Sequence, residues 1–252
     1  MKIILINKAE IDQRPEIKSI TIRCLPHSGS NWLRQLVNLN CPSLQWIISS
    51  KNETVLTYDK YHNQINSTRL IIEDTDGKYG WKHDAQLSKP LETHDLLIIL
   101  TRKSLSWIPK MKEQPYQPGF SKRLTMKDFL TRKWSARYRN GKKIGENWTD
   151  IFEMRSTKFM TWLNMVQTYS NAIIVKYEDL VDDGGEEFFK NLTRNFKIDC
   201  SAAFQKIDAY SKYGVATNKT FSEEEYSWND DDKSYVTGKL NVDLERRLSY
   251  LK

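Results

Sequence analysis

A β-branched, apolar run passes through a short polar turn into a helical pattern near the start of the chain, and this transition limits the fold more than any other feature. The run SITIRCL, from Ser19 to Leu25, is typical of a central strand. The run WLRQLV, from Trp32 to Val37, has helical spacing and good helix formers. A buried strand that leads directly into a helix is the unit from which α/β sheets are built. We therefore expect a central parallel sheet covered by helices.

The turn between this strand and helix, PHSGSN, has the composition of an anion-binding loop. Gly29 permits positive φ and a close approach of the backbone to a ligand, while the hydroxyls of Ser28 and Ser30 can donate to phosphate oxygens. The first N–H groups of the helix point at such an anion. An ordinary connection capped by Ser30 or Asn31 is the alternative. The turn lacks a lysine followed by Ser or Thr, which separates it from the loop of common ATPases and GTPases.

Size and charge narrow the class of protein. The 252 residues contain no evident linker, so a single domain over residues 1–252 is expected. The net charge of +7 favours an anionic partner, such as a nucleotide or an acidic glycan. Nucleic acid is disfavoured because lysine and arginine are spread along the chain and interleaved with acids.

The cysteines and the N-terminal residues indicate the cellular compartment in which the protein is expected. Cys24, Cys41 and Cys200 lack CxxC spacing, so neither a disulfide framework nor a zinc site is predicted, and reduced thiols are expected. The initial apolar run MKIILIN is too short for the core of a signal peptide or for a membrane span. These features predict a cytoplasmic protein without stable membrane insertion.

Two further apolar runs are typical of interior parallel strands: HDLLIILTR, which begins at His94, and NAIIVKYEDL, which begins at Asn171. Ligands gather at the carboxyl ends of the strands in an open parallel sheet. We therefore expect three polar segments to converge on one edge, namely Pro26–Asn31, Thr101–Lys103 and Tyr177–Asp179.

The remaining segments are expected to cover the sheet or to border the site. Helical patterns cover Met126–Asn140 and Ile151–Tyr169, and helical spacing returns in Val242–Leu251. Prolines predict a loop over Pro109–Phe120, and mixed acidic and aromatic residues predict a surface lid or loop over Glu223–Lys239.

Taken together, separate segments of the chain resemble the sulfotransferases that use 3'-phosphoadenosine 5'-phosphosulfate (PAPS). LPHSGSNWLRQLV is similar to that family's loop for the 5'-phosphosulfate, and LLIILTRKSLSWIPKMKEQPYQ to its strand and helix for the 3'-phosphate. IIVKYEDLV matches the family's Y-E-D-L strand end. The resemblance extends from Ile20 to Asp182. It implies a P-loop-like sulfotransferase architecture, a three-layer sandwich with a central parallel sheet.

The same resemblance implies roles for individual residues. YGWKHDAQL is similar to the segment that supplies the family's catalytic base, which here is His83 with Lys82 beside it. Trp32 either stacks on adenine or packs in the core, and the family's chemistry requires no metal. The implied PAPS-binding residues are His27, Ser28, Gly29, Ser30, Asn31, Trp32, Arg102 and Lys110.

The chain also departs from the family pattern. His27 stands where the family has Lys or Arg, so a permanent charge is replaced by one that titrates. Activity then requires either protonated His27 or the charge of Lys82. Lys110 stands in place of a serine and retains attraction for the 3'-phosphate, whereas Ser104 replaces a proline.

Several residues have a structural and a functional interpretation. The carboxylates of Tyr177–Asp179 either face the site or tie neighbouring elements together, and the second is favoured. Arg155 and Lys158 share a helix face that is either solvated or part of an anionic acceptor groove. Four aromatic residues either form a platform that binds a sugar acceptor or pack in the core: Trp107, Tyr116, Trp134 and Trp148.

The sequence thus predicts an enzyme that moves a sulfuryl group from PAPS to a hydroxyl or amine of a carbohydrate or small metabolite and releases adenosine 3',5'-bisphosphate. One alternative is a nucleotide or small-molecule kinase with a variant phosphate loop. Against a kinase, the sequence lacks the Lys-Ser/Thr pair of the usual phosphate loop and an evident group of Mg²⁺ ligands. The other alternative is a non-catalytic anion- or nucleotide-binding module that lost turnover through the change at His27.

Overall fold

The structure, a computed structural model, describes residues 16–48, 55–58, 64–67, 72–73, 78–79, 82–115, 123–137, 143–181, 185–200, 203–206, 209–211, 216–217 and 226–251. A parallel sheet in the order β5-β2-β1-β6-β9 forms its centre, as the sequence predicts. These strands are β1 (Ser19–Cys24), β2 (Gln45–Ile48), β5 (Ile72–Glu73), β6 (Asp95–Thr101) and β9 (Ala172–Lys176).

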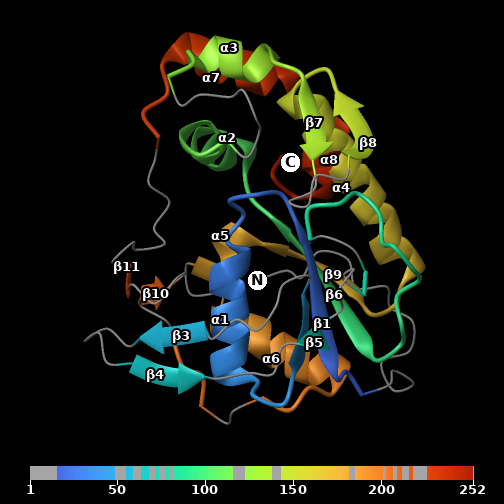
Figure 1. Cartoon of the computed structure of the whole chain (residues 1–252). Helices are drawn as coiled ribbons and strands as arrows, with labels where there is room; N and C mark the ends of the chain where they lie inside the picture. Colours follow the sequence, from blue (N-terminus) through green and yellow to red (C-terminus); the bar gives the residue numbers. More distant parts are fainter. Residues whose placement is uncertain are drawn as a thin grey trace.

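Helices surround this sheet (Figure 1). They are α1 (Ser30–Asn40), α2 (Ser104–Glu113), α3 (Met126–Thr131), α4 (Ile151–Thr168), α5 (Tyr177–Asp179), α6 (Gly185–Phe196), α7 (Asp230–Lys239) and α8 (Val242–Arg247). Within the described ranges, no helix combines the length and the apolar character needed to cross a membrane.

Two smaller sheets lie beside the centre (Figure 1). One joins β3 (Val55–Tyr58), β4 (Gln64–Ser67), β10 (Ala209–Ser211) and β11 (Ala216–Thr217), and the other joins β7 (Trp134–Arg137) to β8 (Lys143–Trp148).

The two faces of the central sheet pack into separate cores. On β6, Leu96, Ile98 and Leu100 belong to the core that includes α1 and α6, whereas Leu97 and Ile99 belong to the core that includes α2, α3, α4 and α8. Both faces of β6 are therefore buried, which explains its unbroken apolar sequence. Figure 1 shows the sheet between α1 and α4. The result is helix, sheet and helix in three layers.

Strand register aligns the carboxyl ends of the three central strands. Cys24 of β1 pairs with Leu100 of β6. The next residue, Thr101, pairs with Lys176 at the end of β9. The segments that follow these strands consequently leave the sheet at the same edge.

The helix predicted for Met126–Asn140 is wrong from residue 132 to residue 137, and residues 138–140 lie outside the described residues. The chain there becomes β7, in which Trp134 pairs with Trp148 of β8. The ring of Trp134 meets Phe129 edge-on, with 5.6 Å between centroids. Burial of this tryptophan in the core, together with the strand pairing, overrides the local helical pattern.

The loop predicted for Pro109–Phe120 is also wrong in its first part, because α2 continues through Pro109. A proline cannot donate the helical hydrogen bond to Leu105, four residues earlier. The indole Nε1 of Trp228 donates to that carbonyl instead, at 3.0 Å. A distant side chain therefore satisfies the acceptor that the proline leaves open. Residues 116–122 of the predicted loop lie outside the described residues.

A helix, α7, replaces the later part of the lid or loop predicted for Glu223–Lys239. Asn229 precedes it and caps it, since its side chain accepts a hydrogen bond from the Asp232 N–H at 2.8 Å. Acidic residues in the first turn interact favourably with the helix dipole. The acidic cluster is thus a helix start. Residues 223–225 lie outside the described residues.

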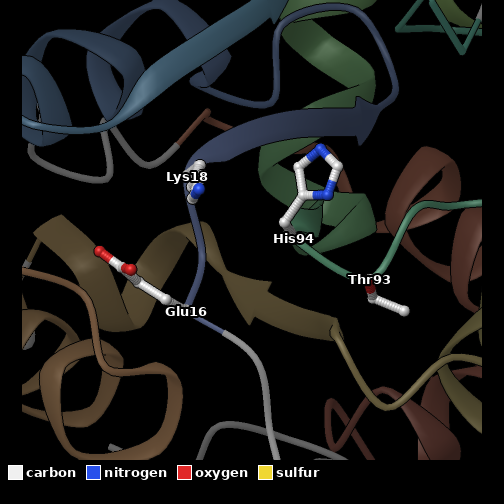
Figure 2. A pocket seen from close by; sticks show the side chains of 4 residues that line it. All are labelled: Glu16, Lys18, Thr93 and His94. Atoms are coloured by element: carbon white, nitrogen blue, oxygen red, sulfur yellow. The ribbon is translucent and has the colours of Figure 1, made fainter.

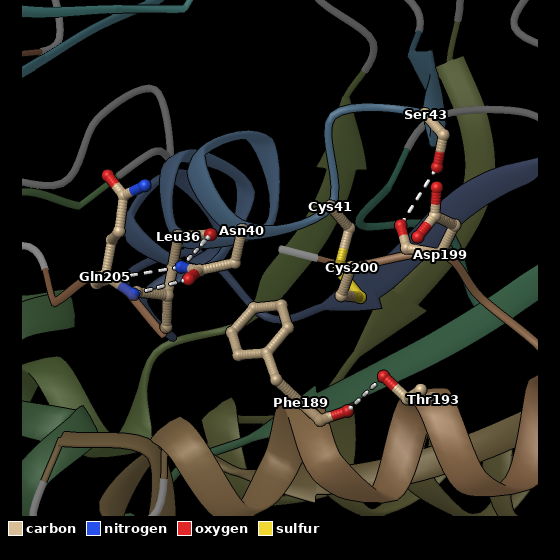
Figure 3. The surroundings of a disulfide bond; sticks show 9 residues. All are labelled: Leu36, Asn40, Cys41, Ser43, Phe189, Thr193, Asp199, Cys200 and Gln205. Atoms are coloured by element: carbon tan, nitrogen blue, oxygen red, sulfur yellow. Dashed lines mark hydrogen bonds between the residues drawn. A yellow bond between two sulfur atoms is a disulfide. The ribbon is translucent and has the colours of Figure 1, made fainter. Parts of the chain in front are cut away.

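A disulfide joins Cys41, directly after α1, to Cys200, which follows α6 (Figure 3). The expectation of reduced thiols is wrong for this pair and holds only for Cys24, which is free and buried. A second link accompanies the bond, because Asn40 Nδ2 donates to the carbonyl of Gln205 at 2.9 Å. The two cysteines are 159 residues apart, so only the packing of α1 near α6 reveals the pair.

Candidate functional site

The turn after β1, the end of β6 and the end of β9 contact one another at one edge of the sheet, as the sequence predicts. Arg102 Nη1 donates to the carbonyl of His27 at 3.2 Å. Its guanidinium also lies over the ring of Tyr177, 4.5 Å from the centroid. The Lys103 N–H donates to Glu178 at 2.8 Å. Glu178 therefore ties neighbouring elements together, which confirms the favoured interpretation of its carboxylate.

Backbone conformation in the turn is specialised. His27 and Gly29 both have positive φ, at 62° and 86°. A Cβ atom at Gly29 would lie 2.5 Å from the ring of Tyr177. The close approach that requires glycine is therefore made, in this structure, to a protein ring.

The first turn of α1 faces the same edge. In the part of the chain that the structure describes, no side chain caps the helix at Gly29, and its first turn has no acidic residue. The alternative of an ordinary cap by Ser30 or Asn31 is not observed. Ser28 is buried, whereas Ser30 and Asn31 are partly exposed. The first turn of α1 is therefore left without a side-chain cap, and the N-terminus of a helix favours negative charge.

Lys82 and His83 lie against this turn. Lys82 Nζ donates to Ser30 Oγ at 3.0 Å. His83 Nδ1 lies 2.6 Å from the carbonyl oxygen of Cys24, which can only accept, so Nδ1 carries the proton and Nε2 of the neutral ring keeps its lone pair. Burial, together with the charge of Lys82, lowers the pKa of His83 well below its usual value. The ring is therefore neutral at pH 7 and can accept a proton at Nε2.

The side chain of His27 turns toward the end of α2. Its Nε2 lies 2.9 Å from the carbonyl of Gln114. Trp107 of α2 fixes the same turn by donating from Nε1 to the carbonyl of Pro26 at 2.7 Å. Lys82, by contrast, contacts a hydroxyl of the turn, that of Ser30.

Arg102 is oriented by a residue that the sequence reasoning missed. Ser106 Oγ accepts from Arg102 Nε at 3.2 Å, and the spacing of four residues at the start of α2 is the signal that could have found it. Lys110 lies one helical turn farther along and pairs with Glu113 at 3.3 Å. Arg102 is partly exposed, so a ligand can reach it.

Buried tryptophans around the site pack the core. Trp32 is 5% exposed and meets Tyr177 edge-on, with 6.5 Å between centroids. No contact described here supports adenine stacking by Trp32, which stays a prediction. The sugar-platform interpretation is wrong for three of its members, and Tyr116 lies outside the described residues. The buried members are Trp107, Trp134 and Trp148, exposed by 1%, 2% and 5%.

Two basic residues of α4 are buried behind the site, so a solvated face is wrong for both. Lys158 donates to the carbonyl of His83, and its ammonium lies 4.9 Å from the ring centroid of Trp148. Arg155 pairs with Glu245 of α8 at 2.6 Å. Lys158 thus supports the segment that carries the candidate base. An acceptor groove at these residues stays a prediction.

A hollow of about 430 Å³ lies at the opposite edge of the sheet (Figure 2). Glu16, Lys18, Thr93 and His94 line it, just before β1 and β6 begin. The loop and strand ends that carry the predicted site residues are at the other end of these strands, so this hollow does not belong to the candidate site.

Near that hollow, Glu92, His94 and Asp95 place possible ligand atoms within 4.8 Å of one another. The ammonium of Lys78 already lies among them, 2.8 Å from Glu92 and 2.7 Å from Asp95. Hydrogen bonds from Lys78, Ser19 and Tyr79 outweigh the effect of burial and lower the pKa of Asp95. The cluster is therefore an internal ion-pair network.

The described contacts bring His27, Ser30, Lys82, His83 and Arg102 around one strand edge. No family model matches the chain, and no curated protein or solved structure matches it either. The function consequently has to be inferred from the chemistry of this site.

Proposed function

We propose that the chain is a PAPS-dependent sulfotransferase, which transfers a sulfuryl group to a hydroxyl or amine of a carbohydrate or small metabolite and releases adenosine 3',5'-bisphosphate. One observation carries the proposal: a cation and a neutral imidazole lie together against the turn after β1. Lys82 Nζ is 3.0 Å from Ser30 Oγ, and His83 Nδ1 is 2.6 Å from the carbonyl of Cys24. A simple phosphate-binding turn needs no such imidazole, whereas transfer to a hydroxyl needs a base.

The proposed step uses groups of this chain. The acceptor oxygen attacks sulfur, and the bond between sulfur and the bridging phosphate oxygen breaks. The acceptor proton moves to Nε2 of His83, which is unprotonated in the neutral ring. The charge that develops on the leaving phosphate is stabilised by the ammonium of Lys82 and by the amide groups at the start of α1.

Arg102 supplies selectivity for the 3'-phosphate in this proposal. The carbonyl of His27, the hydroxyl of Ser106 and the ring of Tyr177 orient its guanidinium, which reduces the entropy lost when a phosphate binds. A planar guanidinium also matches phosphate geometry better than an ammonium does. Lys110 adds a second positive charge one helical turn beyond Ser106 on α2.

The sequence analysis predicted a cytoplasmic protein partly from reduced thiols, and the disulfide removes that argument. Disulfides such as Cys41–Cys200 persist in oxidising compartments and are rare in the cytosol. A cytoplasmic location is therefore not part of the proposal.

Calorimetric titration with adenosine 3',5'-bisphosphate, with AMP and with ATP plus Mg²⁺ tests the proposal. The bisphosphate should bind at least ~10-fold more tightly than AMP, a difference of about 1.4 kcal/mol. Tighter binding of ATP with Mg²⁺ would support a kinase. Binding of the bisphosphate without turnover of PAPS over a panel of hydroxyl and amine acceptors would support a non-catalytic module. No binding of any nucleotide would contradict the proposed function.

A further inference from the structure

The carboxylate of Glu178 bridges two segments that are far apart in the sequence. Its Oε1 accepts a hydrogen bond from the Lys103 N–H at 2.8 Å, and its Oε2 accepts from the Tyr250 hydroxyl at 2.9 Å. Glu178 is 7% exposed, so water does not readily replace either contact. The segment around Tyr250 is thereby linked to the backbone directly after Arg102.

A second chain of contacts reaches the same place from α8. Glu245, which is 2% exposed, pairs with Arg155 at 2.6 Å and accepts from Ser104 Oγ at 3.3 Å. Arg155 Nη2 in turn donates to the carbonyl of Arg102 at 3.4 Å. Contacts from residues 245–250 therefore converge on three successive residues, Arg102, Lys103 and Ser104.

We propose that Glu178 and Tyr250 are positioning residues for Arg102, and that the segment 242–251 thereby sets the affinity of the site for a ligand with a 3'-phosphate. The identity of this ligand rests on the proposed function. The positioning itself concerns only the chain. Neither residue touches the ligand in this proposal; each acts through the backbone that carries the guanidinium.

The geometry explains why the effect is selective for one phosphate. Glu178 and Glu245 hold residues 102–104 at the end of β6, whereas Lys82 and Ser30 belong to the turn side of the site. Loosening the contacts of Glu178 or Glu245 changes the orientation of Arg102 and leaves the contact between Lys82 and Ser30 in place. A 3'-phosphate should therefore be affected more than a 5'-phosphate.

Hydrogen exchange in the ligand-free protein tests the positioning directly. Tyr250→Phe removes the hydroxyl that donates to Glu178, and it should speed exchange of the Lys103 amide by about tenfold. Tyr235→Phe is the matched control, because Tyr235 lies on α7 and its ring packs edge-on against Phe152. That variant should leave exchange at Lys103 unchanged.

Ligand titration tests the consequence. Tyr250→Phe should weaken binding of adenosine 3',5'-bisphosphate by roughly 3- to 10-fold, the effect of one hydrogen bond, and should leave AMP binding unchanged. In an Arg102→Ala background, the same substitution should have no further effect on the bisphosphate. If Tyr250→Phe weakens AMP and the bisphosphate equally, the positioning role is wrong.

Substitutions at Glu178 separate positioning from a general loss of folding. Glu178→Gln keeps an oxygen that can accept from Lys103, so it should restore most of the slow exchange that Glu178→Ala loses. Unchanged exchange at Lys103 in both Tyr250→Phe and Glu178→Ala would overturn the inference. If the wild-type protein binds no bisphosphate, the proposed function fails, while exchange at Lys103 still decides whether these residues position the turn.

Discussion

The ring of Tyr177 lies so close to Gly29 that a Cβ atom at this glycine would be 2.5 Å from it. Gly29 also has φ of 86°, in the left-handed region that glycine tolerates best. The ring follows β9 and the glycine follows β1, with β6 between these two strands, so the contact fixes the turn against the end of β9 across β6. The turn that we propose binds the anion is thus shaped by the protein's own tyrosine.

Gly29→Ala should therefore destabilise the protein by at least about 2 kcal/mol, because the new methyl group meets the ring and the backbone is strained. Urea unfolding measures the change. Gly238→Ala is the matched control, since a Cβ there meets nothing within 4 Å and α7 is helical at that position. The control should be stabilised by roughly 0.5 to 1 kcal/mol. Equal effects at the two positions would contradict this account of the turn.

His83 should remain neutral while ordinary histidines titrate. Burial and nearby Lys82 lower its pKa, so its imidazole should still show the neutral Nδ1–H tautomer by NMR at about pH 6.5, where an ordinary histidine is half protonated. The unfolded chain takes up a proton at this residue near pH 6.5, and the native state does not. The free energy of unfolding should consequently fall as the pH decreases below about 6.5.

His83→Asn should reduce sulfuryl transfer by ~10²- to 10⁴-fold, because the amide can still donate toward the Cys24 carbonyl but offers no base. Binding of the bisphosphate should persist. His94→Asn at the opposite edge is the control and should retain turnover. Full turnover by His83→Asn would exclude His83 as the base.

Arg102→Ala should raise the Kd for adenosine 3',5'-bisphosphate by about 10- to 100-fold, the usual range for hydrogen bonds to a charged group. AMP lacks the 3'-phosphate, so its Kd should not change. For Arg102→Lys, the Kd for the bisphosphate should lie between that of the wild-type protein and that of Arg102→Ala, since an ammonium keeps the charge and loses the planar fork. Arg194→Ala removes an equal charge from an exposed position on α6 and controls for net charge. A similar loss in that control would assign the effect to long-range electrostatics.

Reduction of Cys41–Cys200 should lower the free energy of unfolding by about 2 to 5 kcal/mol, because the bond closes a long loop. Thermal melts with and without reductant measure this loss, and the Cys41→Ser/Cys200→Ser variant should no longer respond to reductant. In the denatured, unreduced protein, only Cys24 of the 3 cysteines should react with a thiol reagent. Labelling of Cys41 or Cys200 would show that the bond is absent.

The strands illustrate how far the sequence alone can be taken. The apolar run of β1 predicts the strand correctly, because a buried strand needs such residues. It does not reveal what its polar members do: Ser19 donates to the Asp95 side chain, and Arg23 donates to the carbonyl of Tyr79. Those partners are 76 and 56 residues away. Both lie opposite β1 only after the sheet and the segment before β6 have packed.

The sequence predictions were wrong at three helices, and the reasons differ. The start of α7 has a local signal in Asn229 and the acids after it, so the sequence contained the answer. The end of α3 has no local sequence signal of comparable strength. The helix ends there because Trp134 pairs with Trp148 in the following strand. Pro109 lies within α2, and Trp228 satisfies the carbonyl of Leu105 that the proline leaves open.

By itself, the sequence determined the alternation of strands and helices and the edge at which Pro26–Asn31, Arg102 and Glu178 meet, because strand burial and parallel pairing follow from local patterns. Tertiary structure alone decided the disulfide, the link from Tyr250 to Glu178 and the burial of the tryptophans. Local propensities act over a few residues, whereas these contacts join distant segments.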